Sequence, residues 1–278
     1  MDGRQIRGIR LPAAVFELEN VSYSYERVVA LDAASLAIPA GQRVALLGAN
    51  GSGKSTLLRL LDGLCFAGPG TIRFRGEPVT EERFQDETFS FDFRRRVGLI
   101  FQNPDVQLFN PTVFDEVAFG PLQLRWPRDL IRQRVAQTLD DLDIAHLKDR
   151  PPHRLSGGEK KRVAIASVLI LDPQVLLLDE PTAALDPRSQ SQTIDLLAGW
   201  KDTGRTVVTA THDLDSVEEI ADYCFVFQAG RLVAQGSPAA VLGDTNLLRQ
   251  TGLLHVHRHT HGSGEVHSHP HRHHDPQP

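Results

Sequence analysis

The sequence contains few cysteines and no long apolar run, and each absence excludes a class of protein. Its 278 residues include only two cysteines, Cys65 and Cys224, which lie far apart and predict neither a disulfide scaffold nor a thiolate metal site. No stretch approaches the roughly 18 to 20 consecutive apolar residues of a membrane-spanning helix. The N-terminus lacks the apolar segment of a signal peptide. We therefore expect the chain to work in the reducing environment of the cytoplasm.

An excess of positive charge is also missing. The formal net charge is −5 and the isoelectric point is near 6.2. A protein that binds long nucleic acids neutralises many phosphates, so we expect no nucleic-acid partner. Hydrophobic residues make up 41% of the chain and charged residues 23%, which is enough apolar material for a sizeable core. The length fits one large α/β domain, which we place at residues 1–253.

The first part of the chain alternates between strand and helix patterns. Residues 15–21 and 43–47 are short runs of β-branched and apolar residues, separated by a turn signal at residues 38–41. Residues 55–64 have leucines at helical spacing. Because a glycine-rich loop joins the second strand to this helix, the pattern predicts a strand, loop and helix unit.

The middle of the chain predicts a separate helical lobe. A further strand is expected at residues 97–101, and a helical pattern follows over residues 113–145, with Pro121 and Pro127 as breaks. We place the whole lobe at about residues 103–165. It is inserted between two parts of the α/β core.

The pattern after the lobe predicts a long helix and a buried parallel sheet. Ser156 and Glu159 have the spacing of a capping box at the start of a helix. Residues 175–178 are a continuous apolar run, which is typical of a strand covered on both faces, and residues 206–211 repeat the pattern. The charged residues 94–96 and 160–162 are expected on solvated faces.

Residues 48–56 match the phosphate-loop pattern in the strand-to-helix context that its mechanism requires. The glycines let successive backbone N–H groups point inward, and the helix start adds partial positive charge. We expect Lys54 to contact the β- and γ-phosphates and the Ser55 hydroxyl to bind Mg²⁺. Alone, this loop predicts only a bound nucleoside triphosphate, so kinases, GTPases and motors stay open. The expected ATP ligands are Gly48, Ala49, Asn50, Gly51, Ser52, Gly53, Lys54, Ser55 and Thr56.

Two carboxylates follow the predicted strand at residues 175–178. Asp179 suits Mg²⁺, and Glu180 suits a general base that polarises the attacking water. Binding sites of open α/β sheets gather at such strand ends. The alternative is that these residues only end a strand and begin a turn.

Further motifs identify a family. The segment Leu155, Ser156, Gly157, Gly158 and Glu159 resembles the ABC ATPase signature, whose usual last residue is Gln. The resemblance covers about residues 16–250. It implies a phosphate-loop NTPase (RecA-like) core with an antiparallel β subdomain and an inserted helical subdomain, that is, an ABC nucleotide-binding domain. It also adds Gln102 of the Q-loop, Ala184, Leu185 and Asp186 of the D-loop, the switch residue His212, and Tyr25 against adenine, with Tyr23 as the alternative.

This resemblance implies roles for these residues. Glu180, His212 and Gln102 would be catalytic, and Gln102 would join Ser55 and Asp179 around Mg²⁺. The signature (155–159) and Asp186 would face the ATP of a second subunit, so a homodimer is the simplest assembly. Residue 159 keeps a capping role although it is Glu.

Residues 101–109 and 115–121 resemble the energy-coupling-factor branch of ABC importers, particularly its cobalt and nickel members. This resemblance implies that a groove in the helical lobe receives a helix from an integral membrane transporter subunit. The chain would then lie peripherally on the cytoplasmic face of the inner membrane and power import of cobalt or nickel. The alternative for these residues is an ordinary surface loop followed by a helix start.

Residues 254–278 change composition and cannot build a core, so we expect a disordered tail. Alternating histidines suit Ni²⁺, Co²⁺, Zn²⁺ or Cu²⁺ and predict a metal-binding sponge or sensor. A purification tag or a solvated tail without a role are the alternatives. The tail holds nine of the twelve histidines: His255, His257, His259, His261, His267, His269, His271, His273 and His274.

Three competing functions are weighed against cation import. An importer of the same branch for a vitamin would keep every catalytic motif without needing the tail. A metal storage or delivery protein would bind nucleotide only incidentally. An ABC ATPase of translation or DNA repair would be expected to show tandem motif sets, a coiled coil or a basic face, and this sequence shows none of them.

Overall fold

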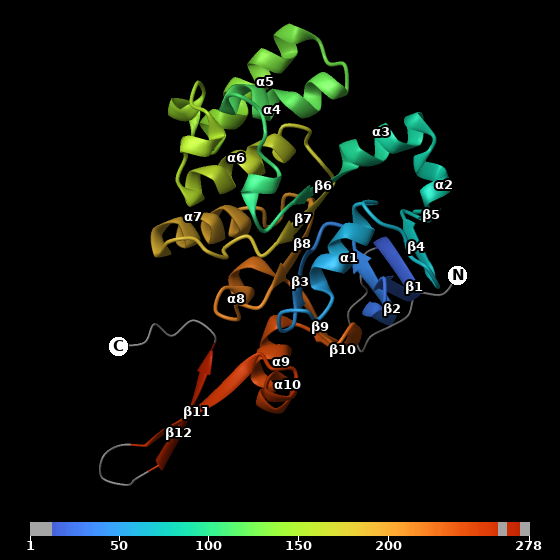
Figure 1. Ribbon diagram of the computed structural model, residues 1–278, viewed down its shortest axis with the longest axis vertical. Coiled ribbons are helices and arrows are strands. Elements are labelled where there is room, and N and C mark those ends of the chain that lie inside the picture. The colour runs from blue at the N-terminus through green and yellow to red at the C-terminus, as the bar shows by residue number, and fades with distance from the viewer. Residues whose placement is uncertain (1–12, 261–265, 273–278) are drawn as a thin grey trace.

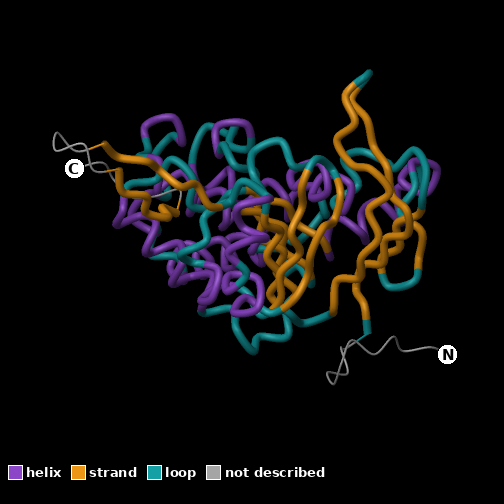
Figure 2. Tube along the Cα trace, turned by 90° about the horizontal axis from the view of Figure 1, so that it is seen from below, coloured by secondary structure: helices purple, strands orange, loops and turns teal. Residues whose placement is uncertain are grey.

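The structure is a computed structural model that describes residues 13–260 and 266–272, with side chains described up to residue 254. The described strands form a six-stranded sheet, a four-stranded sheet and a two-stranded hairpin. Figure 1 shows a group of helices at one end of the molecule and the hairpin at the other. The two larger sheets lie next to each other, and Figure 2 shows most helices gathered to one side of them.

The six-stranded sheet forms the centre because most of its strands are buried, whereas the edge strand β10 alternates exposed and half-buried residues. Every residue of β3, β7 and β8 is buried, as expected for parallel strands covered on both faces. The strands β9, β3, β8, β7 and β6 run parallel, and β10 is an antiparallel edge. In sheet order the strands are β10 (Arg231–Gly236), β9 (Tyr223–Gln228), β3 (Arg43–Leu47), β8 (Thr206–Thr211), β7 (Val175–Asp179) and β6 (Val97–Ile100).

The second sheet is antiparallel, as the sequence resemblance implies. Its two long strands pair with several register shifts, which bend the ribbon. It packs against the central sheet through a shared apolar cluster that includes Phe16, Leu46 and Phe225. In sheet order its strands are β2 (Val28–Pro39), β1 (Ala14–Tyr25), β4 (Thr71–Phe74) and β5 (Glu77–Pro78).

Helices cover both faces of the central sheet. The helix after the phosphate loop is shorter than predicted, because Gly63 takes a positive φ of 68° after its C-cap residue Asp62. Within the described residues no helix is both long enough and apolar enough to cross a bilayer. Outside the lobe the helices are α1 (Lys54–Leu61), α2 (Glu81–Phe84), α3 (Glu87–Arg96), α7 (Pro187–Ala198), α8 (Val217–Ile220), α9 (Pro238–Gly243) and α10 (Thr245–Gln250).

The helical lobe lies between β6 and β7 in the chain. One prediction was wrong here: Pro121 does not break its helix, which continues to Gln123. The proline lies in the last turn, where it removes one N–H donor, and the helix ends two residues later. Pro127, by contrast, precedes the next helix as its N-cap residue. The lobe contains η1 (Pro104–Val106), α4 (Val113–Gln123), α5 (Arg128–Asp141), η2 (Ala145–Leu147), η3 (Pro152–Arg154) and α6 (Gly157–Leu169).

The C-terminal segment differs from the expected disordered tail. β11 (Leu254–Thr260) and β12 (Val266–Arg272) pair as an antiparallel hairpin. The β-branched residues Val256, Thr260 and Val266 favour this extended conformation. The pairing places three histidine pairs opposite each other, His255 with His271, His257 with His269, and His259 with His267. The side chains of this hairpin after Leu254, and all of His261, His273 and His274, lie outside what the structure describes.

Candidate functional site

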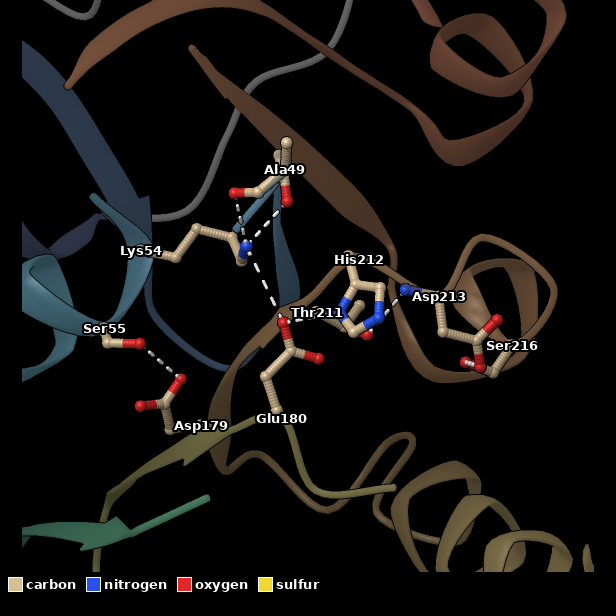
Figure 3. Close-up of polar contacts among 10 residues, drawn as sticks. Ala49, Lys54, Ser55, Asp179, Glu180, Thr211, His212, Asp213 and Ser216 are labelled. Atoms are coloured by element: carbon tan, nitrogen blue, oxygen red, sulfur yellow. Dashed lines mark hydrogen bonds and ion pairs between the residues drawn. The ribbon is translucent and has the colours of Figure 1, made fainter. Parts of the chain in front are cut away.

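The phosphate loop joins β3 to α1 at the carboxyl edge of the central sheet. Gly48 must be glycine because an added Cβ would lie 2.4 Å from the Phe227 carbonyl oxygen, and its φ is 154°. Lys54 is buried, and its amine donates to the carbonyls of Gly48 at 2.6 Å and Ala49 at 3.2 Å. Figure 3 shows this amine directed toward the loop and toward Glu180. The loop is therefore folded around its lysine.

Two oxygen ligands meet beside the loop. The Ser55 hydroxyl donates to Asp179 Oδ1 at 2.9 Å, and Asp179 ends β7 with only 7% of its surface exposed. Burial raises the pKa of this carboxyl, and the Ser55 hydrogen bond opposes that rise. A hydroxyl and a carboxylate at this spacing are the donor types that Mg²⁺ prefers, so these residues fit the ion.

Glu180 lies at the centre of a buried charge cluster. Its Oε1 is 2.9 Å from His212 Nδ1 and 3.6 Å from Lys54 Nζ, and the residue is 5% exposed (Figure 3). Its backbone has a φ of 43°, while its N–H donates to the Ala210 carbonyl. This uncommon conformation turns the chain out of β7 and brings the side chain toward His212.

The same cluster changes the ionisation of its members. The hydrogen bond with Glu180 raises the pKa of His212. Burial lowers the pKa of Lys54, although the charges of Glu180 and Asp179 oppose this. The structure thus brings together five predicted residues: Lys54, Ser55, Asp179, Glu180 and His212.

The signature segment lies at the start of α6, and its predicted capping box is confirmed. The Ser156 hydroxyl accepts from the Glu159 N–H at 3.3 Å, and Glu159 Oε2 accepts from the Ser156 N–H at 2.7 Å. That backbone hydrogen bond lowers the pKa of Glu159. Ser156 and Gly157 are exposed, whereas Leu155 and Gly158 are buried. Among residues 13–254 no hydrogen bond joins this segment to the phosphate loop of its own chain.

The signature packs closely on the first turn of α7, which follows the D-loop. An added Cβ on Gly158 would lie 2.2 Å from Ser189 Oγ. Ser189 is held by Asp186, the N-cap of α7, which accepts from both its N–H and its hydroxyl. These hydrogen bonds lower the pKa of Asp186. The glycine therefore lets α6 and α7 approach each other.

Two other predicted residues lie at the edge of the site. Tyr25 is 40% exposed at the end of β1, and its hydroxyl accepts from Arg59 of α1. Its ring contacts Tyr23 edge to face, with centroids 4.9 Å apart. Gln102 is exposed immediately after β6. Its backbone carbonyl accepts from Lys161 Nζ at 2.8 Å.

The prediction of a solvated face at residues 160–162 was wrong for Lys161. This lysine is 1% exposed, and its Nζ donates to the carbonyls of Phe101 and Gln102. Burial lowers its pKa to about 8, against the opposing charges of Asp179 and Glu180. Helical spacing could have found it, since Lys161 shares a face with Gly158 and Ile165.

Sequence reasoning also missed two residues that hold the segment after Gln102. Gln107 donates to the Ala164 carbonyl at 3.0 Å and accepts from the Phe101 N–H at 3.2 Å. Glu116 is 3% exposed, and its Oε2 accepts from the N–H groups of Phe109 and Asn110. Both residues lay within segments that the energy-coupling-factor resemblance had singled out.

Comparison with known proteins places these features in a family. Residues 31–183 match the family described as ABC transporter. The chain is 58% identical over 242 residues to the nickel import ATP-binding protein NikO of Rhodobacter capsulatus, covering 86% of this chain and 95% of that protein. It is 44% identical over 238 residues to the energy-coupling factor transporter ATP-binding protein EcfA of Carboxydothermus hydrogenoformans, covering 85% and 86%.

Solved structures of ABC transporter ATPases have the same fold as this chain. The cbiO1 structure from Clostridium perfringens, part of the transporter complex cbiONQ, matches with a TM-score of 0.73 and 39% identity over 86% of this chain and 95% of that chain. The dimeric cassette MJ0796 bound to ADP and Pi matches with a TM-score of 0.71 and 26% identity over 80% of this chain and 98% of that chain.

Proposed function

The chain belongs to the ABC transporter ATPase family, and from this membership we propose that it powers the import of nickel or cobalt ions. It is an ATP-hydrolysing enzyme that uses Mg²⁺. The observation that carries the proposal is the cluster of Lys54, Asp179 and Glu180 at the carboxyl edge of the central sheet. The nickel cargo is proposed from the 58% identity to the nickel import ATP-binding protein NikO. Similarity to cbiO1, which is part of the ABC transporter complex cbiONQ, supports a role in a transporter complex.

The phosphate loop binds the triphosphate in this proposal. Lys54 leaves the loop carbonyls and contacts the β- and γ-phosphates, while the N–H groups at the start of α1 complete the cradle. Tyr25 stacks on the adenine, and its link to Arg59 fixes it to the same helix. Ser55, Asp179 and Gln102 would hold Mg²⁺, which when bound would neutralise charge on the phosphate oxygens.

Glu180 acts on the attacking water. Its carboxylate accepts a proton as the water oxygen bonds to the γ-phosphorus and the bond to the β-phosphate oxygen breaks, releasing ADP and phosphate. His212 holds Glu180 through the 2.9 Å contact and adds positive charge near the γ-phosphate. The Glu180 side chain is 7% exposed and the His212 side chain 24% exposed, so the pair lies at the boundary between the core and the site.

Two copies complete the site. Ser156 and Gly157 are exposed at the positive end of α6 and make no hydrogen bond to the phosphate loop of their own chain among the described residues. We propose that these donors, together with Asp186, face the γ-phosphate held by a second copy. The dimeric MJ0796 cassette supports this arrangement. Each homodimer then contains two equivalent sites.

The membrane subunits dock on the helical lobe in this proposal. Val106 and Phe109 are each more than 65% exposed, and Phe109 contacts Phe119 edge to face. Exposed apolar side chains beside the Q-loop suit an apolar helix of a transporter subunit. Such docking would place the chain peripherally on the cytoplasmic face of the membrane.

The histidine-rich hairpin belongs to the same proposal as a store or sensor for the transported cation. Its support is the composition and the paired register of six histidines. Imidazoles suit Ni²⁺ and Co²⁺. Within the residues whose side chains are described, no group of three or more candidate ligands could hold a metal ion.

The test is uptake in native cells whose own copy carries Glu180→Gln. We expect uptake of radioactive nickel or cobalt to fall to background, while the purified variant keeps ATP binding and loses turnover by about 10²-fold, as loss of a general base does. Normal metal uptake together with lost vitamin uptake would show a vitamin importer. Unchanged metal handling by the variant would show a storage protein.

A further inference from the structure

The buried Lys161 joins two parts of the site that lie far apart in sequence. It projects from α6, and its amine donates to Phe101 O at 3.1 Å and Gln102 O at 2.8 Å. The charged end is almost wholly removed from water, with 1% of the residue exposed. A buried ammonium is retained only where hydrogen bonds and nearby charge compensate its lost hydration, and here the two carbonyls supply those hydrogen bonds.

Neighbouring contacts make this connection rigid. One turn further along α6, the Ala164 carbonyl and the Ser167 hydroxyl accept from Gln107 Nε2 at 3.0 and 3.2 Å. Lys160 adds a partly exposed ion pair with Asp105 at 2.7 Å. The segment that carries Gln102 is therefore held to α6 at successive positions along one helix face.

The two ends of this rigid unit face different nucleotides under the proposed function. Gln102 faces the ATP of its own chain, whereas Ser156, five residues before Lys161, faces the ATP of the partner. A movement of Gln102 on ATP binding must then move the start of α6, because packed helices shift as units.

We propose that Lys161 is the positioning residue that transmits nucleotide occupancy from Gln102 of one site to the signature of the other. The inference rests on the proposed dimer, and it assigns a purpose to a lysine that no catalytic motif contains. The two ATP sites hydrolyse cooperatively because Lys161 connects them within each chain.

The test compares Lys161→Met with Lys160→Met in the full-length protein. Methionine keeps the length and apolar stem of Lys161 but removes the ammonium group. We expect Lys161→Met to lower kcat by roughly tenfold. The Hill coefficient for ATP should fall from above 1 to 1. The dissociation constant for Mg-ATP should change by less than about threefold. Lys160→Met, which removes only the partly exposed ion pair with Asp105, should change all three values far less than Lys161→Met does.

Several outcomes would overturn this inference. The inference is wrong if the wild type has a Hill coefficient of 1. It is also wrong if Lys161→Met behaves like Lys160→Met, or if Lys161→Met loses ATP binding and turnover equally. Should Lys161→Met fail to fold, Lys161→Arg, which keeps donors for the carbonyls, must retain cooperativity. Failure of this inference can be told apart from failure of the proposed function, because ATP-driven metal uptake by the wild type and its loss in Glu180→Gln test that function separately.

Discussion

Arg43, at the start of β3, is a buried cation whose stability contribution depends on pH. Its side chain is 5% exposed, and it donates to both Asp222 oxygens and to the Glu219 carbonyl. Burial alone would raise the pKa of Asp222, but the hydrogen bonds and charge of Arg43 lower it. A lowered folded-state pKa means that the pair stabilises the fold above the unfolded pKa of Asp and is lost as pH falls through the folded value.

Asp222→Asn should therefore destabilise the protein at neutral pH. We expect a loss of about 1 to 2 kcal/mol in the free energy of unfolding at pH 7, because the buried Arg43 guanidinium loses its charged partner, whose 37% exposure weakens the interaction. The difference from wild type should begin to shrink below about pH 4, where Asp222 of the unfolded chain becomes protonated, and should vanish only below the lowered folded-state pKa. Urea unfolding of both proteins at several pH values measures this difference in the free energy of unfolding. Asp32→Asn, which breaks the exposed pair with Arg231, is the control, and an equal effect of both variants would refute the argument.

Among the elements, α6 and α7 depend on one glycine for their approach. An Ala at position 158 would gain helix propensity, yet its Cβ would overlap Ser189 Oγ, which Asp186 holds in place. We expect Gly158→Ala to cost about 1 to 3 kcal/mol of stability. Gly157→Ala is the matched control, because its nearest neighbour would be Leu185 Cδ2 at 3.7 Å. Thermal unfolding of both variants measures the difference, and equal stability would show that the contact relaxes freely.

Elements bounded by strong signals could be predicted from the sequence, and those set by tertiary contacts could not. β3 and β8 agree with prediction at both ends because each apolar run meets polar or glycine residues. Pro121 was predicted to break its helix and does not, because a proline in the last helical turn removes only one hydrogen bond. The burial of Lys161 depends on the carbonyls of a distant loop, which no local pattern encodes.

At the scale of the whole molecule, the exposed signature segment predicts that two copies form a dimer only when ATP is bound. We expect Glu180→Gln to run as a monomer without ATP and as a dimer with Mg-ATP, because Ser156 then gains a γ-phosphate partner across the interface. Light scattering after size exclusion measures the mass. The double variant Lys54→Ala/Glu180→Gln should stay monomeric at every ATP concentration. A dimer of equal strength in both variants would mean that the interface does not depend on the phosphate.

The turn that leads into the histidine-rich hairpin lies against the phosphate loop. An added Cβ on Gly252 would be 3.8 Å from Ala49 Cβ, and Leu253 and Leu254 are buried in the apolar cluster that contains Leu47 of β3. Any insertion, deletion or substitution directly after Leu254 is therefore close to the phosphate loop that binds the nucleotide in the proposed function. A fluorescent label attached at the root of the hairpin would report nucleotide exchange, and a bulky fusion placed there would be expected to slow it.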